Sequence, residues 1–477
     1  MYLRDIRFWI FLFFLVRLIG ITYPPIEVGH NWRQTTGTMV ARNFYEVNAN
    51  PYYPKVDFGG EKTGITAMEF PLLNYLIYLF SLIFGYDHWY GRLINLIVSS
   101  CGLYYFYKLI KQLFNEPLAF ASTVLLTCSI WFQFSRKIMP DTFAVSLLLI
   151  SFYQVVLFLK SSTFQGLRLL AAALFFMCGA MSKLPAIIPL FALPLLYFTW
   201  PHRVRWSALL LVFTVASLPV LHWYFIWTDH LTEAYGMHHF FMGKNVSNGA
   251  QEISNHIGLT LHRVFIGPLK YIGGAMFLFG TVYAMIRKNK SLMYVLFLTG
   301  IALCLVILKS GETFYAHDYY ILPFVPVFAL IVAYGISQLP LKWSYIALVI
   351  ICLESVLNQY HDLRWKPSYE AFVQLESIMD LHTQPQDKIA VNCAPNPSTL
   401  YFAHRTGWIC SNEELLQPDR VAEMQAFGLK YILICKTRFG NDLDLPSLDV
   451  LFENEQFRLY RLEDKRPSHG IAQSALH

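Results

Sequence analysis

The chain has 477 residues, of which 55% are hydrophobic, 17% aromatic and only 14% charged, and its formal net charge is +6. A soluble domain carries about 25% charged residues, and a soluble protein of this length would need a charged surface around each of roughly three domains. The composition therefore excludes an ordinary cytosolic enzyme, a disordered protein and a nucleic-acid-binding protein. It indicates a polytopic membrane protein.

Apolar runs that are long enough, or nearly long enough, to cross a bilayer recur through the first three quarters of the chain. A hydrocarbon core of about 30 Å requires about 20 apolar residues per helix. About eleven runs approach this length: 8–22, 90–107, 117–134, 142–159, 167–181, 185–200, 206–227, 268–286, 291–308, 319–337 and 342–358. The sequence therefore predicts an α-helical membrane domain over residues 1–358 with about eleven transmembrane helices.

A further apolar run, 70–86, is placed by the distribution of charge. If this run does not span the membrane, Lys and Arg are concentrated in the short loops on one side: 1–7, 108–116, 160–168, 201–206, 287–290 and 338–342. Basic residues gather in cytoplasmic loops, so this bias predicts a cytoplasmic N-terminus. A span at 70–86 would invert every later loop and abolish the bias. We therefore expect an interfacial helix at 70–86, after a first extracytoplasmic loop at 23–69.

The composition changes sharply near residue 359. The segment 359–477 is polar and contains short strand-like runs at Lys388–Asn392, Lys430–Cys435 and Phe457–Leu462, with a helical stretch at Pro418–Phe427. Strands that alternate with helices are typical of an α/β fold. The predicted topology places this small α/β C-terminal domain outside the cytoplasm.

Three turns between apolar runs carry charges on the predicted outer face. Arg136 and Asp141 lie in the turn SRKIMPD, Lys183 lies in MSKLP, and His317, Asp318 and Tyr319 lie in HDYY. A tight turn with a capping Asp or an interfacial aromatic belt would explain such residues without a ligand. Charges at membrane depth are costly, however, and are therefore candidates for function. Arg136 and Lys183 could bind a phosphate, and residues 317–319 suit a rim that binds a sugar or an acceptor.

The first loop contains a second group of polar residues before a helical run. Glu27, His30 and Arg33 lie within seven residues of one another, in the segment that leads into the predicted helix Thr35–Tyr45. A carboxylate, an imidazole and a guanidinium at a helix entrance could combine base catalysis with the binding of an anion.

Several of these segments, in the same order, resemble the motifs of the GT-C superfamily of membrane glycosyltransferases. The resemblance extends over about residues 1–340 and is greatest to the protein O-mannosyltransferases and the lipid A aminoarabinose transferases. It is carried by short motifs: HNWRQTTGTMVARNF in the first loop, MEFPLLNYL at 68–76, FGYDHWYGRL at 84–93, SRKIMPD at 135–141, MSKLP at 181–185 and HDYYILPFVP at 317–326.

The resemblance implies a GT-C fold and an inverting transfer of a sugar from a polyprenyl-phosphate donor to a glycan, lipid or protein acceptor. The reaction would take place at the outer face of the bacterial cytoplasmic membrane, without nucleic acid as a partner. Lys183, Arg136 and Arg33 would hold the donor phosphate, and His317, Asp318 and Tyr319 would bind acceptor or sugar. No metal site and no certain cofactor are expected, because no tight carboxylate cluster demands a divalent ion.

The sequence departs from the family at the catalytic position. An Asp-Glu pair precedes the Arg of the first-loop motif in these families, whereas this chain has His30-Asn31. The base that deprotonates the acceptor is then Glu27, Asp141 or His30. Phe70 likewise stands where some relatives have a phosphate-binding Lys.

Two other classes of function remain as alternatives. One is a transporter or flippase for a polyprenyl-linked sugar, although such proteins often have repeated halves and charges near the middle of the membrane. The other is a non-catalytic subunit of a complex that assembles envelope glycans, which the loss of the acidic pair would allow.

Overall fold

The computed structural model describes residues 5–26, 29–238, 243–364 and 369–463. The chain divides into two compact units. The first contains residues 1–54 and 66–365, and the second contains residues 55–65 and 366–477.

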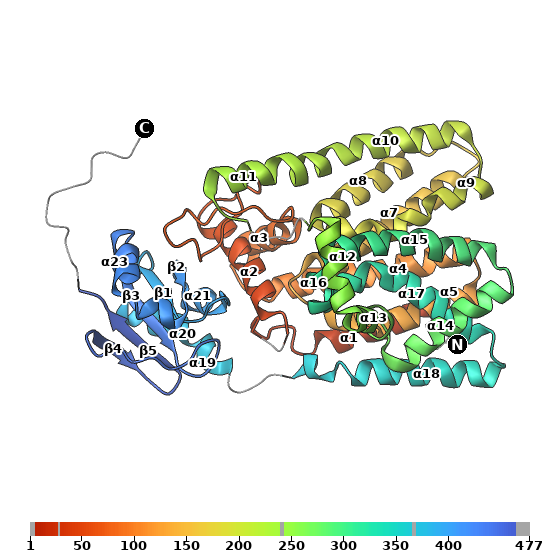
Figure 1. Cartoon of the computed structure of the whole chain (residues 1–477). Helices are drawn as coiled ribbons and strands as arrows, with labels where there is room; N and C mark the ends of the chain where they lie inside the picture. The colour runs from red at the N-terminus through yellow and green to blue at the C-terminus, as the bar shows by residue number, and fades with distance from the viewer. Residues whose placement is uncertain (1–4, 27–28, 239–242, 365–368, 464–477) are drawn as a thin grey trace. The chain divides into compact units, whose positions relative to one another are not determined.

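The first unit is helical (Figure 1). Its elements before residue 200 are α1 (Ile6–Leu18), α2 (Asn31–Glu46), α3 (Leu72–Phe84), α4 (Tyr90–Leu113), α5 (Glu116–Cys128), α6 (Trp131–Phe134), α7 (Pro140–Lys160), α8 (Gly166–Ser182), the 3₁₀ segment η2 (Leu184–Leu195) and α9 (Leu196–Thr199). Those after residue 200 are α10 (Arg203–His222), the π-helical η3 (Trp223–Trp227), α11 (Thr228–Tyr235), α12 (Val246–Asn255), α13 (Ile257–Phe265), α14 (Lys270–Ile286), α15 (Lys290–Ser310), α16 (Glu312–Ala316), η4 (Asp318–Phe324), α17 (Val325–Ser337), α18 (Leu341–Leu357) and η5 (Tyr360–Leu363).

Each predicted apolar run coincides with one or two of these helical elements. Within the described residues, five helices are individually long and apolar enough to cross a membrane. A sixth span is formed if α13 and α14, which are bent by 84° relative to each other, count as one. The run 70–86 forms the shorter helix α3, which has 13 residues, as many as α1.

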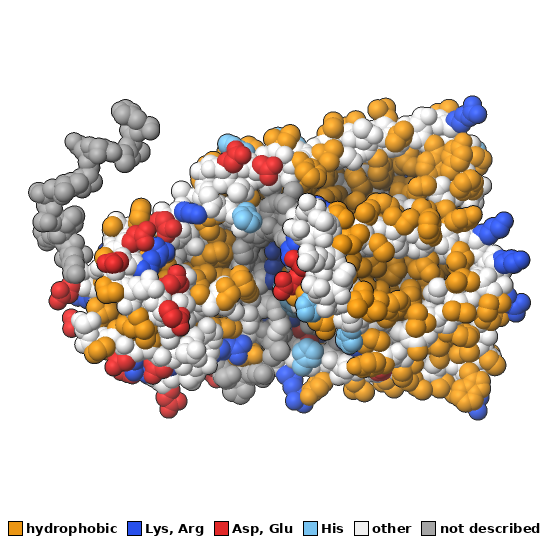
Figure 2. Space-filling view, in the orientation of Figure 1, with side chains coloured by type: hydrophobic (Ala, Val, Ile, Leu, Met, Phe, Trp, Pro, Cys, Tyr) orange, Lys and Arg blue, Asp and Glu red, His pale blue; other side chains and the backbone are white. Residues whose placement is uncertain are grey.

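The surface of the helical unit is apolar. Orange side chains cover the long helices in Figure 2, and Lys and Arg gather at one end of them, at the right of the view. Large apolar side chains on α10 and α14 are more than half exposed, among them Leu210 (71%) and Ile286 (70%). Exposing these side chains to water costs about 25 cal/mol of free energy for every Å² of apolar area. A surface of this kind is therefore suited to contact with lipid.

Close helix contacts inside the unit depend on small residues. A Cβ atom added at Gly102 of α4 would lie 2.3 Å from Oγ of Ser146 on α7. One added at Gly280 of α14 would lie 2.4 Å from the carbonyl oxygen of Ile331 on α17. Small residues of this kind let membrane helices approach closely.

The second unit is an α/β domain. Its strands β1 (Lys388–Val391), β2 (Gly407–Ile409), β3 (Leu429–Cys435), β4 (Asp449–Glu453) and β5 (Phe457–Arg461) form one sheet in the order β2-β1-β3-β5-β4. Strand β1 is parallel to β2 and β3, whereas β5 is antiparallel to β3 and β4. The helices are α19 (Glu370–Val373), α20 (Leu375–His382), α21 (Ser398–Ala403), α22 (Asn412–Leu415) and α23 (Pro418–Ala426).

A segment of the first loop completes this sheet. The backbone N–H of Gly407 donates to the carbonyl of Asp57, and the N–H of Gly60 donates to the carbonyl of Gly407, both at 2.9 Å. The indole of Trp408 donates to Glu61 at 2.8 Å. Residues 55–65 therefore cover the edge strand β2, which would otherwise expose unpaired backbone groups.

Candidate active site

Four charged residues from four separate segments of the helical unit meet in one group, which we call the charged cluster: Arg33, Glu69, Asp141 and Lys183. Arg33 lies on α2, Glu69 precedes α3, Asp141 is in the first turn of α7, and Lys183 follows α8. Glu69 Oε1 lies 2.5 Å from Nη2 of Arg33 and 3.2 Å from Nζ of Lys183. Lys183 Nζ lies 3.5 Å from Oδ1 of Asp141.

Backbone contacts on both sides hold Glu69 in place. The indole N–H of Trp223 donates to the carbonyl of Met68 at 3.0 Å, and the N–H of Phe70 donates to the carbonyl of Met181 at 3.2 Å. The Phe70 ring packs edge-on against Trp223, with centroids 4.9 Å apart. Phe70, which stands where relatives have a Lys, is thus a packing residue that fixes its acidic neighbour.

Glu69, Asp141 and Lys183 are buried and Arg33 is partly exposed, and the charges of the cluster stabilise one another. Burial alone would raise the pKa of Glu69, but Arg33 and Lys183 outweigh it and lower the pKa to about 2. Burial lowers the pKa of Lys183, but Asp141 and Glu69 outweigh that effect and leave its pKa above the ordinary value. Arg33, Glu69 and Lys183 are therefore ionised at neutral pH, as expected for charges that are well paired.

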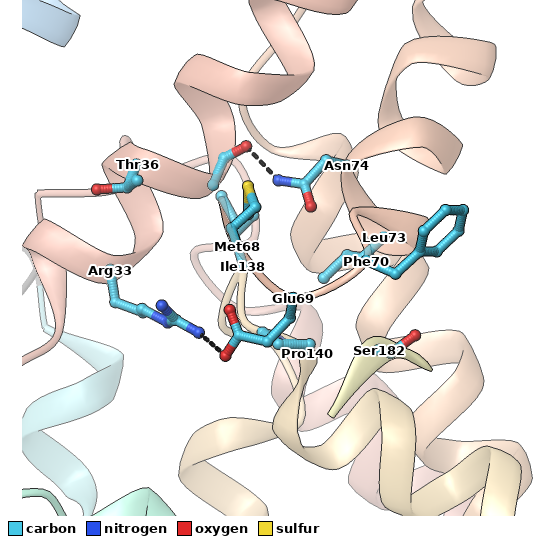
Figure 3. A pocket seen from close by; sticks show the side chains of 11 residues that line it. Arg33, Thr36, Met68, Glu69, Phe70, Leu73, Asn74, Ile138, Pro140 and Ser182 are labelled. Atoms are coloured by element: carbon cyan, nitrogen blue, oxygen red, sulfur yellow. Dashed lines mark hydrogen bonds and ion pairs between the residues drawn. The ribbon is translucent and has the colours of Figure 1, made fainter. Parts of the chain in front are cut away.

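Two carboxylate oxygens of the cluster are buried without a hydrogen-bond donor among the described residues: Oε2 of Glu69 and Oδ2 of Asp141. Buried polar atoms nearly always have a partner, so these two oxygens suit the hydroxyl groups of a ligand. Arg33 and Glu69, whose ion pair is drawn in Figure 3, lie side by side on the lining of a pocket. The volume of this pocket is about 430 Å³ with the open solvent at its mouth included. The pocket is lined by Arg33, Thr36, Gly37, Met68, Glu69, Phe70, Leu73, Asn74, Ile138, Pro140 and Ser182.

Aromatic rings form one side of the cluster. Lys183 Nζ lies 5.3 Å from the ring centroid of Tyr319 and 5.4 Å from that of Tyr320, in cation–π contact. The Tyr319 ring stacks on His317, with centroids 5.3 Å apart. The HDYY motif, far along the chain, therefore joins the residues of the first loop.

His30 also contacts Tyr319. Its Nε2 is 2.7 Å from Oδ1 of Asp318, and its ring contacts Phe134 and Tyr319 with centroids 5.2 and 5.3 Å away. His30 caps the start of α2 in the left-handed conformation, with φ of 59°. Among non-glycine residues this conformation is uncommon, and His, Asn and Asp adopt it most readily.

Arg136 belongs to a different group of charges. It ion-pairs with Asp362 (Nε to Oδ2, 3.6 Å) and also donates to the backbone carbonyls of Ile19 and Asp362. Arg17 and Lys137 pair with the same carboxylate at 2.5 and 3.1 Å, and all four side chains are fully buried. These contacts tie α1, the turn before α7 and the segment after α18 together, which favours a structural part for Arg136.

Glu69 and Asp362 were not predicted from the sequence, whereas Glu27, which was proposed as a base, lies outside the described residues. Glu69 carried a recognisable signal, because it is the acidic residue in the otherwise apolar motif MEFPLLNYL. Within the described part of the chain, no group of three or more His, Cys, Asp or Glu side chains is arranged to hold a metal ion.

Part of the chain matches a known protein family in sequence. Residues 68–227 match the family model described as "Dolichyl-phosphate-mannose-protein mannosyltransferase". No curated protein matches the sequence.

Two solved structures have a similar fold at low sequence identity. The crystal structure of ArnT from Cupriavidus metallidurans bound to undecaprenyl phosphate matches at 9% identity and a TM-score of 0.59, with 95% of this chain and 98% of ArnT covered. The archaeal oligosaccharyltransferase AglB from Archaeoglobus fulgidus, in complex with an inhibitory peptide and a dolichol-phosphate, matches at 11% identity and a TM-score of 0.54, with 90% of this chain and 69% of AglB covered. The resemblance to GT-C membrane glycosyltransferases is thereby confirmed: the chain has their fold, and its residues 68–227 match the protein mannosyltransferase family model.

Proposed function

We propose that this chain is an inverting glycosyltransferase that moves a sugar from a polyprenyl-phosphate donor to a glycan, lipid or protein acceptor. The observation that carries the proposal is the charged cluster. It combines two cations with two carboxylates at the ends of apolar helices, and its Arg33 and Glu69 line a pocket. The family match at 68–227 covers Glu69, Asp141 and Lys183 of this cluster and supports the same class of reaction.

The two cations suit the leaving group. A polyprenyl-phosphate sugar is a phosphodiester with one negative charge, and the departing polyprenyl phosphate gains a second. Arg33 and Lys183 are held in place by Glu69 before substrate arrives, so they can stabilise this developing charge without rearranging. Interactions of this kind accelerate the reaction because they strengthen in the transition state.

The carboxylates suit the sugar and the acceptor. The unpartnered oxygens of Glu69 and Asp141 can accept hydrogen bonds from hydroxyl groups. The rings of His317 and Tyr319 give an aromatic face beside them. Asp141 and Glu69 would thus orient the anomeric carbon between the phosphate and the incoming nucleophile, and correct orientation lowers the barrier substantially.

The distribution of Lys and Arg along the chain supports an extracytoplasmic position for the charged cluster. With basic loops in the cytoplasm, the cluster and the α/β unit would lie outside the cytoplasmic membrane, and the N-terminus inside. A donor carried by a membrane-anchored lipid reaches such a site laterally, from the bilayer.

The test is sugar transfer in detergent from undecaprenyl-phosphate-linked sugars to a panel of lipid, glycan and peptide acceptors. Wild type should transfer, and Lys183→Met should lower kcat/KM by about 10²-fold or more, as the loss of one preorganised electrostatic contact does. Lys244, which pairs with Glu252 at 2.5 Å outside the cluster, provides the matched control Lys244→Met. Full activity after Lys183→Ala and Asp141→Asn together would contradict the assignment of the site, and lipid-linked sugar flux without transfer would favour a transporter.

A further inference from the structure

The pair formed by His30 and Asp318 is the strongest feature that the charged cluster does not explain. The two residues are 288 positions apart in the sequence, and their side chains meet at 2.7 Å while remaining 17% and 26% exposed. A partly exposed histidine held by a carboxylate beside a reaction site is the arrangement in which imidazole acts as a base.

The hydrogen bond fixes the tautomer of His30. A carboxylate only accepts hydrogen bonds, so Nε2 carries the proton that points to Asp318. In the neutral ring Nδ1 is then an acceptor with a free lone pair, and it has no hydrogen-bond partner among the described residues. The hydrogen bond of Nε2 therefore orients the ring, and Nδ1 can accept a proton.

His30 is also close to the charged cluster. Its ring contacts Tyr319, and the same Tyr319 ring contacts Lys183 Nζ, each across 5.3 Å. The centre of the His30 ring therefore lies no farther from Nζ of Lys183 than the sum of these two distances. The imidazole and the amine therefore belong to one neighbourhood around Tyr319.

The carboxylates of the cluster are less suited to accept a proton. Glu69 is bonded to two cations, which lower its pKa to about 2, and Asp141 faces Lys183 at 3.5 Å. Protonation of either would remove one of the two negative charges that pair with the buried Lys183, which is unfavourable. The groups around the His30–Asp318 pair are His317 and Tyr319 of the same turn, Lys137, which donates to the carbonyl of Gly29, and Arg263.

We propose that His30 is the base that deprotonates the acceptor and that Asp318 is the positioning residue for the His30 ring. This assignment rests on the glycosyl transfer proposed above. The acceptor's nucleophilic atom forms a bond to the anomeric carbon while the bond from that carbon to the phosphate oxygen breaks. The proton passes to Nδ1 of His30, and the electron pair leaves with the polyprenyl phosphate, which faces Arg33 and Lys183. Asp318 stabilises the protonated ring. In this chain an imidazole would thus perform the step for which the family motif has an acidic pair.

The experiment measures turnover and lipid binding separately. Turnover uses undecaprenyl-phosphate-linked mannose, glucose, galactose and aminoarabinose as donors, and binding uses undecaprenyl phosphate. His30→Asn is the test variant because Asn tolerates the left-handed backbone, and the expected loss in kcat is about 10²–10⁴-fold, with undecaprenyl phosphate binding unchanged. His404, which has φ of 49° and pairs with Glu376 at 2.6 Å in the α/β unit, supplies the matched control His404→Asn.

The pH profile distinguishes a base from a structural residue. His30→Asp should retain part of the activity and move the acid limb of the pH–rate profile to lower pH, because carboxylates become protonated only at lower pH. Asp318→Asn should lower kcat less than His30→Asn does and should also move the acid limb to lower pH, because the ring loses the charge that stabilises its protonated form.

Wild-type-like kcat and pH profile in His30→Asn would overturn the assignment of the base while leaving the glycosyl transfer intact. An unchanged pH profile in Asp318→Asn would overturn its positioning role. If wild type turns over none of the donors and does not bind undecaprenyl phosphate, the proposed function itself fails, and the inference fails with it.

Discussion

The substitution Glu69→Gln is the most informative perturbation of the charged cluster. It keeps the size of the side chain but removes the negative charge that pairs with Arg33 and Lys183. The pKa of Glu69 falls from an ordinary 4.5 to about 2 in the folded chain, and each unit of pKa corresponds to 1.36 kcal/mol. The ionised carboxylate therefore contributes about 3 kcal/mol to stability, in the range measured for breaking buried ion pairs.

The pH dependence of this contribution has a definite sign. Because the folded pKa is lower than the unfolded one, the contribution is complete above pH 4.5 and is lost as the pH falls toward 2. Wild type should therefore lose stability over this window, and Glu69→Gln should start from a lower apparent Tm at pH 7 and lose less on acidification.

The assay is thermal unfolding of both proteins in the same detergent between pH 7 and pH 3. Glu453 supplies a matched control, because it pairs with Lys436 and Arg458 at 2.5 and 2.8 Å and its pKa is also lowered to about 2. That carboxylate is on an exposed strand, where solvent screens the pair, so Glu453→Gln should change the Tm less. Equal stability of wild type and Glu69→Gln at pH 7, or a larger effect of Glu453→Gln, would refute the reasoning.

Three further perturbations test the packing within each of the two units. Asp362→Asn leaves Arg17, Arg136 and Lys137 without their shared carboxylate, so it should destabilise the fold by about 3–5 kcal/mol, and fluorescence-detected size-exclusion chromatography should show loss of the monodisperse peak. Gly280→Val places a side chain against the backbone of α17 and should lower the Tm, whereas Gly300→Val, where a Cβ meets no neighbour within 4 Å, should not. Trp408→Ala removes the indole that bonds Glu61 and packs on Gly60, so proteolysis within residues 55–65 should become faster; an unchanged cleavage rate would contradict the part assigned to this segment.

Much of the fold could be predicted from patterns within single segments. Apolar runs located the helices, and the change in composition near residue 359 located the α/β unit, because both signals depend only on nearby residues. Strands β1, β3 and β5 coincide with predicted runs, whereas β2 has only three residues and too short a pattern to recognise. The addition of residues 55–65 to this unit was not predictable, because it depends on pairing between Asp57 and Gly407 across 350 positions.

Several residues of the candidate site could be proposed from the sequence, but Glu69 and the geometry of the cluster were not predicted. Charges that interrupt apolar sequence made Lys183, Asp141 and the HDYY turn candidates, because each such charge requires a partner or a ligand. Sequence alone could not show that Arg33 meets Glu69 or that His30 meets Asp318, since these contacts depend on how the helices pack. Arg136 was grouped with Lys183 because both lie in charged turns, but its carboxylate partner, Asp362, follows the last long helix of the first unit.

The central claim is that Arg33 and Lys183 hold the phosphate of a lipid-linked sugar. The most direct measurement is mass spectrometry of the lipid that remains bound to the purified chain, compared between wild type and the double variant Arg33→Met, Lys183→Met. We expect wild type to retain a polyprenyl phosphate or its sugar conjugate and the double variant to retain much less. Equal retention by both proteins, or no polyprenyl phosphate in wild type, would contradict the claim.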